Sequence, residues 1–429
     1  MANLPNNNFT TNTLSLHAGY EYDRQRTLSV PIYQSTAYSF ENAEQAAARF
    51  SLEELGNIYS RLTNPTVDML AKRIAAVEGG AFGVATASGS SSVFYSLVNL
   101  AQNGDNIAYS NKIYGGSQTL LVHVLKRFGI EGRVFDIDNL SSLEKIIDDK
   151  TKAIFFESLS NPQIAIADVE TITNIAKKHK IVTICDNTVA TTILFRHFDF
   201  GVDVSVHSLT KYINGHGSGL GGAVIEREGL NELIKDNSRY PAFNTPDESY
   251  HGLIYANLPL PIFSIRILIE WLRNIGASLS PQNAWIHFQG LETLELRIQK
   301  HSDSALEIAK FLESHKKVKE VNYPGLTSSP YHNLLKKYFK DSRASGLLSF
   351  EAKSYEEAKK ICDSLTLYSI TANIGDSKSL VIHPASTTHS QLSESELKSA
   401  GITPNTVRLS IGLETVSDLI ADLKKAIEK

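Results

Sequence analysis

The stretch Asp203-Val-Ser-Val-His-Ser-Leu-Thr-Lys-Tyr-Ile-Asn-Gly-His-Gly-Ser-Gly219 holds the features from which both fold and chemistry can be predicted. Residues 202–206 form an apolar, largely β-branched run, which predicts a buried strand. Ser208, Thr210 and Lys211 follow at once. An amine just past a buried strand can form a Schiff base, and hydroxyls beside it can donate to a phosphate. We therefore interpret Lys211 as the covalent anchor of pyridoxal phosphate, although an exposed lysine in a turn would show the same pattern.

Glycines are dense after this lysine, and flexible backbone there would let a bulky cofactor lie against the chain. The run Gly217-Ser-Gly-Leu-Gly-Gly222 also matches the dinucleotide-binding pattern G-x-G-x-x-G. That motif needs a helix after it to receive the pyrophosphate, whereas 223–225 (Ala-Val-Ile) continues as a strand. The context therefore argues against a nicotinamide oxidoreductase.

Strands and helices alternate upstream of this stretch. Residues 153–156 and 181–185 read as strands, with a helix over 168–178 between them. This βαβ rhythm predicts an α/β fold with a mostly parallel sheet, whose ligands bind beyond the carboxyl ends of the strands. Polar side chains follow three successive strands at Asn161, at 186–188 (Asp-Asn-Thr) and at 208–211, so we expect them to meet in one crevice.

The residue types at these strand ends suit the cofactor. Pyridoxal phosphate draws electrons only while its ring nitrogen stays protonated, and the Asp186 carboxylate is the candidate that holds this proton. Asn161 could donate to the phenolic oxygen of the ring. Cys185 lies within a strand, so we interpret it as a small core residue.

A second candidate element is a phosphate seat near residue 88. A strand around 84–87 leads into Ser88-Gly89-Ser90-Ser-Ser92 and then into an apolar helix, so backbone N–H groups would face an anion at the helix start. A simple helix cap gives the same pattern. Tyr114, before two glycines, could stack on a flat ring or belong to the core.

Composition excludes several classes of protein. The 429 residues carry 42 basic and 46 acidic side chains, a net charge of −4, which gives no electrostatic case for nucleic acid or an anionic membrane. Two cysteines rule out a disulfide framework and fit a reducing cytoplasm. The polar N-terminus does not resemble a signal peptide, and no stretch reaches the roughly 20 apolar residues of a membrane span.

We expect an arm over residues 1–60, with a helix near 42–55, then a catalytic domain over 61–285 and a smaller α+β domain over 286–429. A long helical region over 283–314 separates the last two. The irregular loop at 240–252 has the length typical of a lid or substrate loop.

Two polar features stand out in the C-terminal part. Arg408 lies between apolar neighbours of a predicted strand and could bind a substrate carboxylate or form a structural ion pair. The spacing of His383 and His389, without nearby cysteines, does not support zinc, and we expect no metal site. Ser386 between these histidines invites a hydrolase interpretation, but no nucleophile elbow precedes it.

Together these motifs resemble the Cys/Met-metabolism pyridoxal-phosphate enzymes along nearly the whole chain. The motifs that carry this resemblance are Tyr59-Ser-Arg61, Asn64-Pro-Thr66, Ser88-Gly89, Tyr114-Gly-Gly116, Glu157-Ser158, Asn161-Pro162, Asp186-Asn-Thr188, Ser208-Leu-Thr-Lys211 and Val407-Arg-Leu-Ser-Ile-Gly412. The resemblance implies a large domain like that of aspartate aminotransferase, with a seven-stranded sheet. It departs from the family's pattern at Ser90, where relatives often carry Met or Gln, and at Ser160, where Gly is usual.

The resemblance also implies roles for individual residues. Lys211 would anchor the cofactor and shuttle protons, Asp186 would pair with the ring nitrogen, and Tyr114 would stack on the ring. The further cofactor-binding residues would be Ser88, Gly89, Ser90, Asn161, Thr188, Ser208 and Thr210, with Tyr59 and Arg61 reaching the phosphate of a neighbouring subunit. Asn161, Ser386 and Arg408 would hold the substrate carboxylate. A site shared between subunits implies a homo-oligomer, and the relatives imply that this is a homotetramer.

Four stretches most resemble one branch of this family: 246–252, 280–285, 290–294 and 383–391. In that branch sulfide or methanethiol replaces the acetoxy group on the γ-carbon of O-acetyl-L-homoserine, giving L-homocysteine or methionine and acetate. Cystathionine γ-synthase, O-succinylhomoserine sulfhydrylase and methionine γ-lyase share the same site, and remain alternatives because one acyl group is worth only about 1–3 kcal/mol of discrimination. A non-catalytic, aminotransferase-like regulator would need a DNA-binding module, which the sequence lacks.

Overall fold

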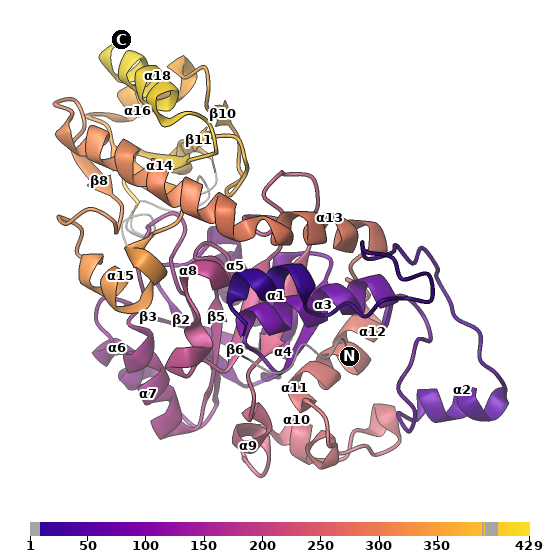
Figure 1. Ribbon diagram of the computed structural model, residues 1–429. Helices are drawn as coiled ribbons and strands as arrows, with labels where there is room; N and C mark the ends of the chain where they lie inside the picture. The colour runs from indigo at the N-terminus through magenta and orange to yellow at the C-terminus, as the bar shows by residue number, and fades with distance from the viewer. Residues whose placement is uncertain (1–8, 388–389, 391–401) are drawn as a thin grey trace.

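The computed structural model describes residues 9–387, 390 and 402–429. Its larger part contains a seven-stranded sheet, below the C-terminal elements in Figure 1, with the spatial order β1-β7-β6-β5-β4-β2-β3. The strands are β1 (Phe82–Thr86), β2 (Asn106–Ser110), β3 (Glu131–Phe135), β4 (Thr151–Glu157), β5 (Val182–Asp186), β6 (Val204–Ser208) and β7 (Gly222–Glu226). Of these seven, β7 alone runs against its neighbours, which confirms the mostly parallel sheet.

Helices cover both faces of this sheet, which is why its central strands are apolar on both sides. The helices of this part and of the arm are α1 (Thr11–His17), α2 (Ala43–Phe50), α3 (Pro65–Glu78), α4 (Gly89–Val98), α5 (Gly115–Thr119), α6 (Ser141–Ile146), α7 (Val169–His179), α8 (Thr191–Leu194), α9 (Leu230–Ile234), α10 (Pro241–Asn244), α11 (Ile262–Arg266) and α12 (Arg273–Ile275). Among the described residues, no helix is both long and apolar enough to cross a membrane.

Local sequence signals set several of these boundaries. The Asn64 side chain accepts from the backbone N–H groups of Thr66 and Val67, and Pro65 takes the first position of α3. Gly79 ends the helix with φ = 79°, a conformation that glycine adopts without strain. Downstream of Lys211, β7 begins at Gly222, so the glycine pattern there leads into a strand and not into a helix.

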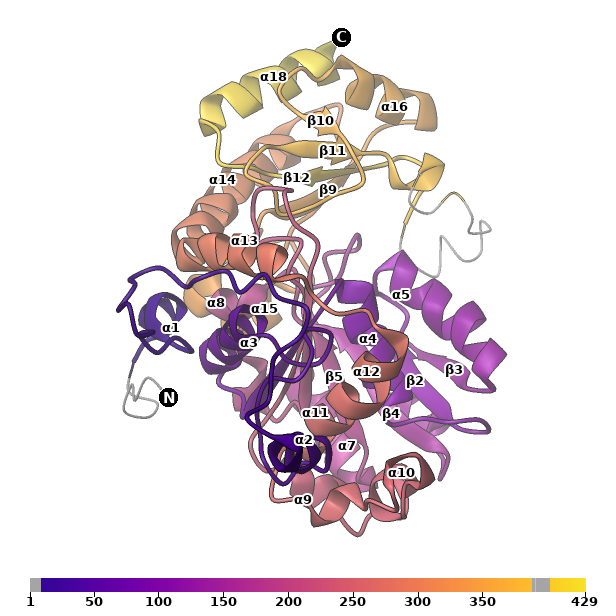
Figure 2. The same ribbon diagram turned by 90° about the vertical axis from the view of Figure 1, so that its right-hand side faces the viewer.

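The C-terminal part is built around a five-stranded sheet of order β10-β11-β12-β9-β8. Its strands are β8 (Glu320–Asn322), β9 (Leu347–Glu351), β10 (Ser369–Ile370), β11 (Leu380–Ile382) and β12 (Thr406–Ser410). The associated helices are α14 (Leu294–Ser314), α15 (His332–Tyr338), α16 (Tyr355–Ser364) and α18 (Val416–Glu428). Figure 2 shows α16 and α18 on the side of this sheet that faces away from the larger part.

The expected long helix over 283–314 is two helices, α13 (Pro281–Glu292) and α14, which meet at Thr293. The cause is tertiary: the Arg297 guanidinium on α14 donates to the Gly290 carbonyl at 2.5 Å and to the Tyr212 carbonyl at 2.7 Å. Gly290 lies inside α13, where a Cβ would come within 2.2 Å of the Ile213 carbonyl oxygen. This glycine therefore allows α13 to pack directly on the chain after Lys211. The predicted division into residues 1–60, 61–285 and 286–429 stays a prediction.

Two further expectations need correction. The arm helix is shorter than 42–55, because α2 ends at Phe50. The 240–252 loop begins at the amino ends of the parallel strands, where the Tyr240 hydroxyl accepts from the backbone N–H of Val182 and donates to the Lys152 carbonyl. Lys211 follows the carboxyl end of β6, so this loop starts at the opposite edge of the sheet and does not form a lid over Lys211 of its own chain.

Candidate functional site

Lys211 lies where the two parts of the chain meet. Its Nζ donates to the Asn373 side-chain oxygen at 2.6 Å, a contact across 162 positions of sequence. Burial, together with repulsion from Arg408, lowers the pKa of the Lys211 amine from 10.5 to about 8. A larger fraction of this amine is therefore neutral and nucleophilic near neutral pH than for an exposed lysine. Asn373 was not predicted, since it lies in a short polar segment without periodicity.

Arg408 on β12 is the second cation of the site. It is 5% exposed, and its guanidinium donates to the Asn161 side chain and to the Asn373 carbonyl, both at 3.0 Å. No carboxylate lies within ion-pair distance of Arg408 in the described residues, and its Nε is buried without a partner there. Of the two alternatives that the sequence allowed for Arg408, the structural ion pair is thus not formed among the described residues, and the guanidinium can accept an anion.

Asp186 is the last residue of β5, at the carboxyl edge predicted for it. The Thr188 backbone N–H donates to its Oδ1 at 2.9 Å, and the Thr188 hydroxyl accepts from the Ser208 N–H at 2.8 Å. Thr188 therefore fixes the position of the Asp186 carboxyl and of Ser208, the last residue of β6. Burial raises the pKa of the Asp186 carboxyl, against the opposing bonds from Thr188 and the charge of His207.

Glu157 holds two of the predicted residues in place, a role that sequence reasoning missed. Its carboxylate accepts from the backbone N–H of Tyr114 at 2.6 Å and from that of Asn161 at 3.1 Å. Burial, and then the nearby charge of Asp186, raise the pKa of Glu157 well above its ordinary value. The Tyr114 ring is 47% exposed and lies against Gly116, so it is not a core residue.

The start of α4 is where the sequence predicts a phosphate seat, and its geometry is compatible with one. The Ser88 hydroxyl accepts from the Ser91 N–H at 3.2 Å and so caps the helix. A Cβ at Gly89 would lie 2.5 Å from the Ser208 Cβ, so only glycine lets the two segments come this close. The first N–H groups of α4 and the Ser208 hydroxyl therefore border one small space, which suits an anion.

Two expectations about the glycine-rich segment stay predictions, and the structure shows what these residues contact within the chain. The Thr210 hydroxyl bonds both the N–H and the carbonyl of Gly221, at 3.1 and 3.3 Å, and so holds this loop in place. The glycines let other parts of the protein come close. Added Cβ atoms there would meet Arg297 at Gly215, Asp376 at Gly217, His287 at Gly221 and Ser88 at Gly222.

Three predicted residues lie apart from this group. The Arg61 guanidinium stacks 5.4 Å from the centre of the Tyr59 ring and donates to the Arg273 carbonyl. Ser386 is exposed and shares a 2.8 Å hydrogen bond with His383. Within the described ranges, no hydrogen bond joins Tyr59, Arg61 or Ser386 to Lys211, Arg408 or the α4 start, and their roles stay predictions. His389 lies outside the described residues.

Comparison with known proteins gives one consistent result. Residues 12–428 match the family of Cys/Met metabolism PLP-dependent enzymes. The chain belongs to this family. It is 44% identical to the O-acetyl-L-homoserine sulfhydrylase of Corynebacterium glutamicum, over 96% of this chain and 95% of that protein. It is 41% identical to the enzyme of the same name from Leptospira meyeri, over 98% and 97% of the two chains.

A solved structure extends the likeness. The crystal structure of a putative O-acetylhomoserine (thiol)-lyase from Campylobacter jejuni has 67% sequence identity and a TM-score of 0.97, covering 98% of this chain and all of that one. That structure contains a pyridoxyl-lysine phosphate. Members of this family are PLP-dependent enzymes, and the expected fold, enzyme class and cofactor are confirmed for this chain.

The residues present fit pyridoxal phosphate. The N–H groups of Gly89 and Ser90, which have no hydrogen-bond partner among the described residues, and the Ser208 hydroxyl could hold its phosphate, and Lys211 could form the covalent bond. Asp186 could face the ring nitrogen, and the exposed Tyr114 ring could stack on the cofactor. Arg408, with its unpartnered Nε, then remains for a substrate carboxylate.

The lowered pKa of Lys211 predicts how cofactor-free protein takes up pyridoxal phosphate. The neutral amine of Lys211 is the nucleophile that bonds the cofactor. The rate of Schiff-base formation should therefore rise about tenfold per pH unit below about pH 8 and level off above it. Stopped-flow absorbance at a series of pH values measures this. Replacing Arg408 with Gln removes a neighbouring positive charge and should move the midpoint upward, whereas a wild-type midpoint near 10.5 would contradict the assignment.

Proposed function

We propose that the protein catalyses γ-replacement on O-acetyl-L-homoserine, with sulfide or methanethiol as nucleophile, giving L-homocysteine or methionine and acetate. The observation that carries this proposal is that Lys211 and Asp186 lie at the carboxyl edge of the seven-stranded sheet, and that Arg408, with no carboxylate beside it among the described residues, reaches Asn161 at this edge from β12 in a PLP-dependent enzyme. The names of the relatives support the choice of substrate, since the 67% identical structure is described as a putative O-acetylhomoserine (thiol)-lyase.

The chain's own groups would divide the work as follows. Pyridoxal phosphate, when bound, supplies an electron sink next to the substrate's α-carbon. The amine of Lys211 removes the α-proton and then a β-proton, and returns protons at the end. The Asp186 carboxylate holds the proton on the ring nitrogen. Arg408, positioned by Asn161 and Asn373, orients the substrate through its carboxylate. Acetate leaves from the γ-carbon, and the sulfur nucleophile bonds to the same carbon.

We also propose that the active sites are shared between subunits of a homotetramer in the cytoplasm. Tyr59 is 40% exposed, and the arm helix α2 projects from the body of the molecule in Figure 1. Exposed aromatic and cationic groups on a thin arm are suited to a neighbouring subunit's surface. Light scattering measures the mass directly. A monomer that is fully active would contradict the sharing.

Product identity is the experiment that tests the substrate and the nucleophile. Purified protein is incubated with O-acetylhomoserine and sulfide and, in parallel, with O-acetylhomoserine and cysteine. We expect homocysteine to form faster than cystathionine. A second pair with O-succinylhomoserine tests the acyl group, and methionine without a co-substrate tests for lyase activity. Dominant cystathionine would move the enzyme to the synthase branch, while the absence of any γ-replacement would refute the proposal.

A further inference from the structure

A buried polar cluster lies behind Asp186, on residues that the proposed reaction does not use. Glu78, the last residue of α3, places its Oε1 2.8 Å from the His207 Nε2 and accepts a hydrogen bond from the Ser205 hydroxyl at 2.6 Å. The His197 Nε2 lies 3.5 Å from the same oxygen. All four side chains are at most 2% exposed. Burying a carboxylate so completely requires a partner charge.

The sheet register brings this cluster close to the cofactor site. Strands β5 and β6 run parallel, and Asp186 pairs with Val206, so His207 is the next residue along. Side chains alternate along a strand, which puts His207 and Asp186 on opposite faces of the same sheet edge. His207 is also one residue before Ser208, at the phosphate seat. It therefore lies between two elements of the site without facing either.

Protons in the cluster can be assigned from its geometry. Burial opposes ionisation of Glu78, but His207, His197 and the Ser205 hydroxyl together lower its pKa to about 2. Burial lowers the pKa of His207, yet attraction to Glu78 and Asp186 raises it above its ordinary value overall. Burial lowers the pKa of His197 to about 4. Near neutral pH Glu78 is thus a carboxylate and His197 a neutral imidazole, and the raised pKa of His207, 2.8 Å from the Glu78 carboxylate, favours the imidazolium form of His207.

The titratable groups around His207 come from four elements. Glu78 on α3 bonds it, and His197, in the 3-10 helix His197–Phe200, lies against the same Glu78 oxygen. Asp186 on β5 acts on His207 through its charge from the other face of the sheet, and Glu157 on β4 acts in turn on Asp186. Asp186 is itself buried, so the low local polarity favours its neutral form. Neutral Asp186 could not hold a proton on the ring nitrogen. A fixed positive charge behind the sheet would remove this difficulty.

We propose that His207, kept as an imidazolium by Glu78, is a positioning residue that keeps Asp186 ionised and so keeps the cofactor's ring nitrogen protonated. This inference rests on the proposed role of Asp186. His207 acts through Asp186 and touches neither substrate nor cofactor. Glu78 acts one step further away, as the group that holds the charge on His207.

The test is ¹⁵N NMR of holoenzyme reconstituted with ring-¹⁵N-labelled pyridoxal phosphate, recorded from about pH 6 to about pH 9. The nitrogen shift reports protonation directly and does not depend on turnover. We expect the wild-type ring to stay protonated across this range. In His207→Gln and in Glu78→Gln it should lose its proton at a pH lower by at least about one unit.

The three cluster variants should differ in a definite order. His207→Gln leaves the Glu78 carboxylate buried without its cation, so the pH at which the ring nitrogen loses its proton should change most in this variant. The double variant removes both charges, and this pH should change less than in His207→Gln alone. This reversal is not expected from general loosening of the core, which would add up across the two changes.

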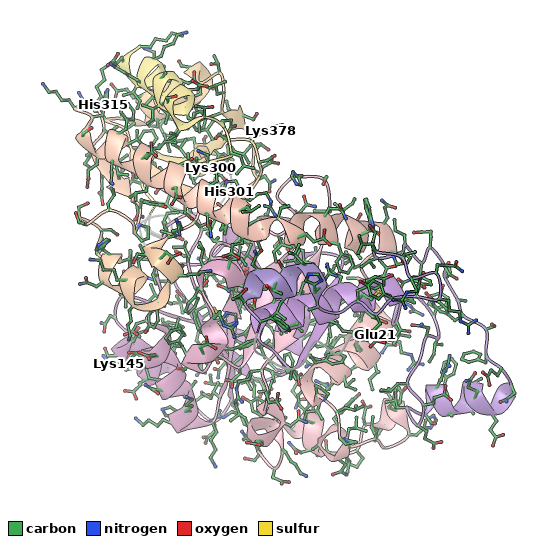
Figure 3. The ribbon with its side chains drawn as sticks, in the orientation of Figure 1. Glu21, Lys145, Lys300, His301, His315 and Lys378 are labelled. Carbon is green, nitrogen blue, oxygen red and sulfur yellow. The ribbon has the colours of Figure 1, made fainter. Side chains whose placement is uncertain are left out.

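His301→Gln is the matched control. His301 is also fully buried, but it lies on α14, in the upper part of the molecule in Figure 3, and bonds the Ile411 carbonyl at 2.6 Å. This replacement should leave the protonation of the ring nitrogen as it is in wild type. Unchanged ring protonation in both His207→Gln and Glu78→Gln would overturn the inference. An Asp186→Asn protein with a wild-type ring would instead contradict the role of Asp186, which separates the two failures.

Discussion

Replacing Lys211 with alanine is expected to lower kcat/KM by about 10⁴-fold or more. The change removes both the covalent attachment of the cofactor and the base that moves the α-proton, and proton transfer by a positioned group alone contributes about 10²–10⁴-fold. After reduction with borohydride, the variant should also carry no covalently bound cofactor. Steady-state assays and mass spectrometry of the reduced protein measure the two effects.

The fold should survive this replacement. Among the described residues the Lys211 side chain makes one hydrogen bond, to Asn373, and it lies at the edge of the core, so the thermal unfolding temperature should change by only a few degrees. Lys178→Ala is the control, because that lysine is exposed and pairs only with Glu144 at 2.8 Å among the described residues. A surface pair of this kind is worth about 0–1 kcal/mol. Turnover retained in Lys211→Ala would refute the anchor.

Asp186→Asn is expected to lower kcat by about 10³-fold. Asparagine keeps the shape and can still accept from the Thr188 N–H, but it carries no charge to hold a proton on the ring nitrogen. The loss should fall on kcat more than on KM, because ground-state contacts remain. Steady-state kinetics with O-acetylhomoserine and sulfide separate the two constants.

Asp303→Asn serves as the comparison for this change. Its side chain is 56% exposed and pairs with Arg343 at 2.9 Å, far from the strand edge that carries Asp186. The same chemical replacement there should leave kcat within about twofold of wild type. If both variants were equally active, Asp186 would not be the ring-nitrogen partner.

The chain's local patterns were sufficient for the central strands and the helix boundaries beside them. The buried strands β4, β5 and β6 read as apolar runs because helices cover both faces of the sheet, and α3 begins and ends at a capping asparagine and a glycine. The short motifs that follow these strands also indicated Lys211, Asp186 and Asn161, since ligand sites in such sheets lie beyond the carboxyl ends of the strands.

Elements with weak local patterns could not be found in this way. Strand β3, Glu-Gly-Arg-Val-Phe, is a half-exposed edge strand without an apolar run. The break between α13 and α14 depends on Arg297, which reaches back to Gly290 and to the chain after Lys211. Gly290 lies within 283–314, but the other partners of Arg297, the carbonyls of Tyr212 and Ile213, lie 85 and 84 positions away, so no local pattern marks the whole contact.

The sequence by itself determined the βαβ core and pointed to the lysine that we propose as the cofactor's anchor, because these follow from local periodicity and from residue types at strand ends. Only the tertiary structure decided which distant groups meet that lysine. Asn373, between β10 and β11, bonds the lysine, and Arg408 on β12 bonds the Asn373 carbonyl. Glu157 positions Tyr114 and Asn161 through backbone bonds. Glu78 meets His207 behind the sheet across 129 positions. Such contacts arise from how whole elements pack, so no short stretch of the chain encodes them.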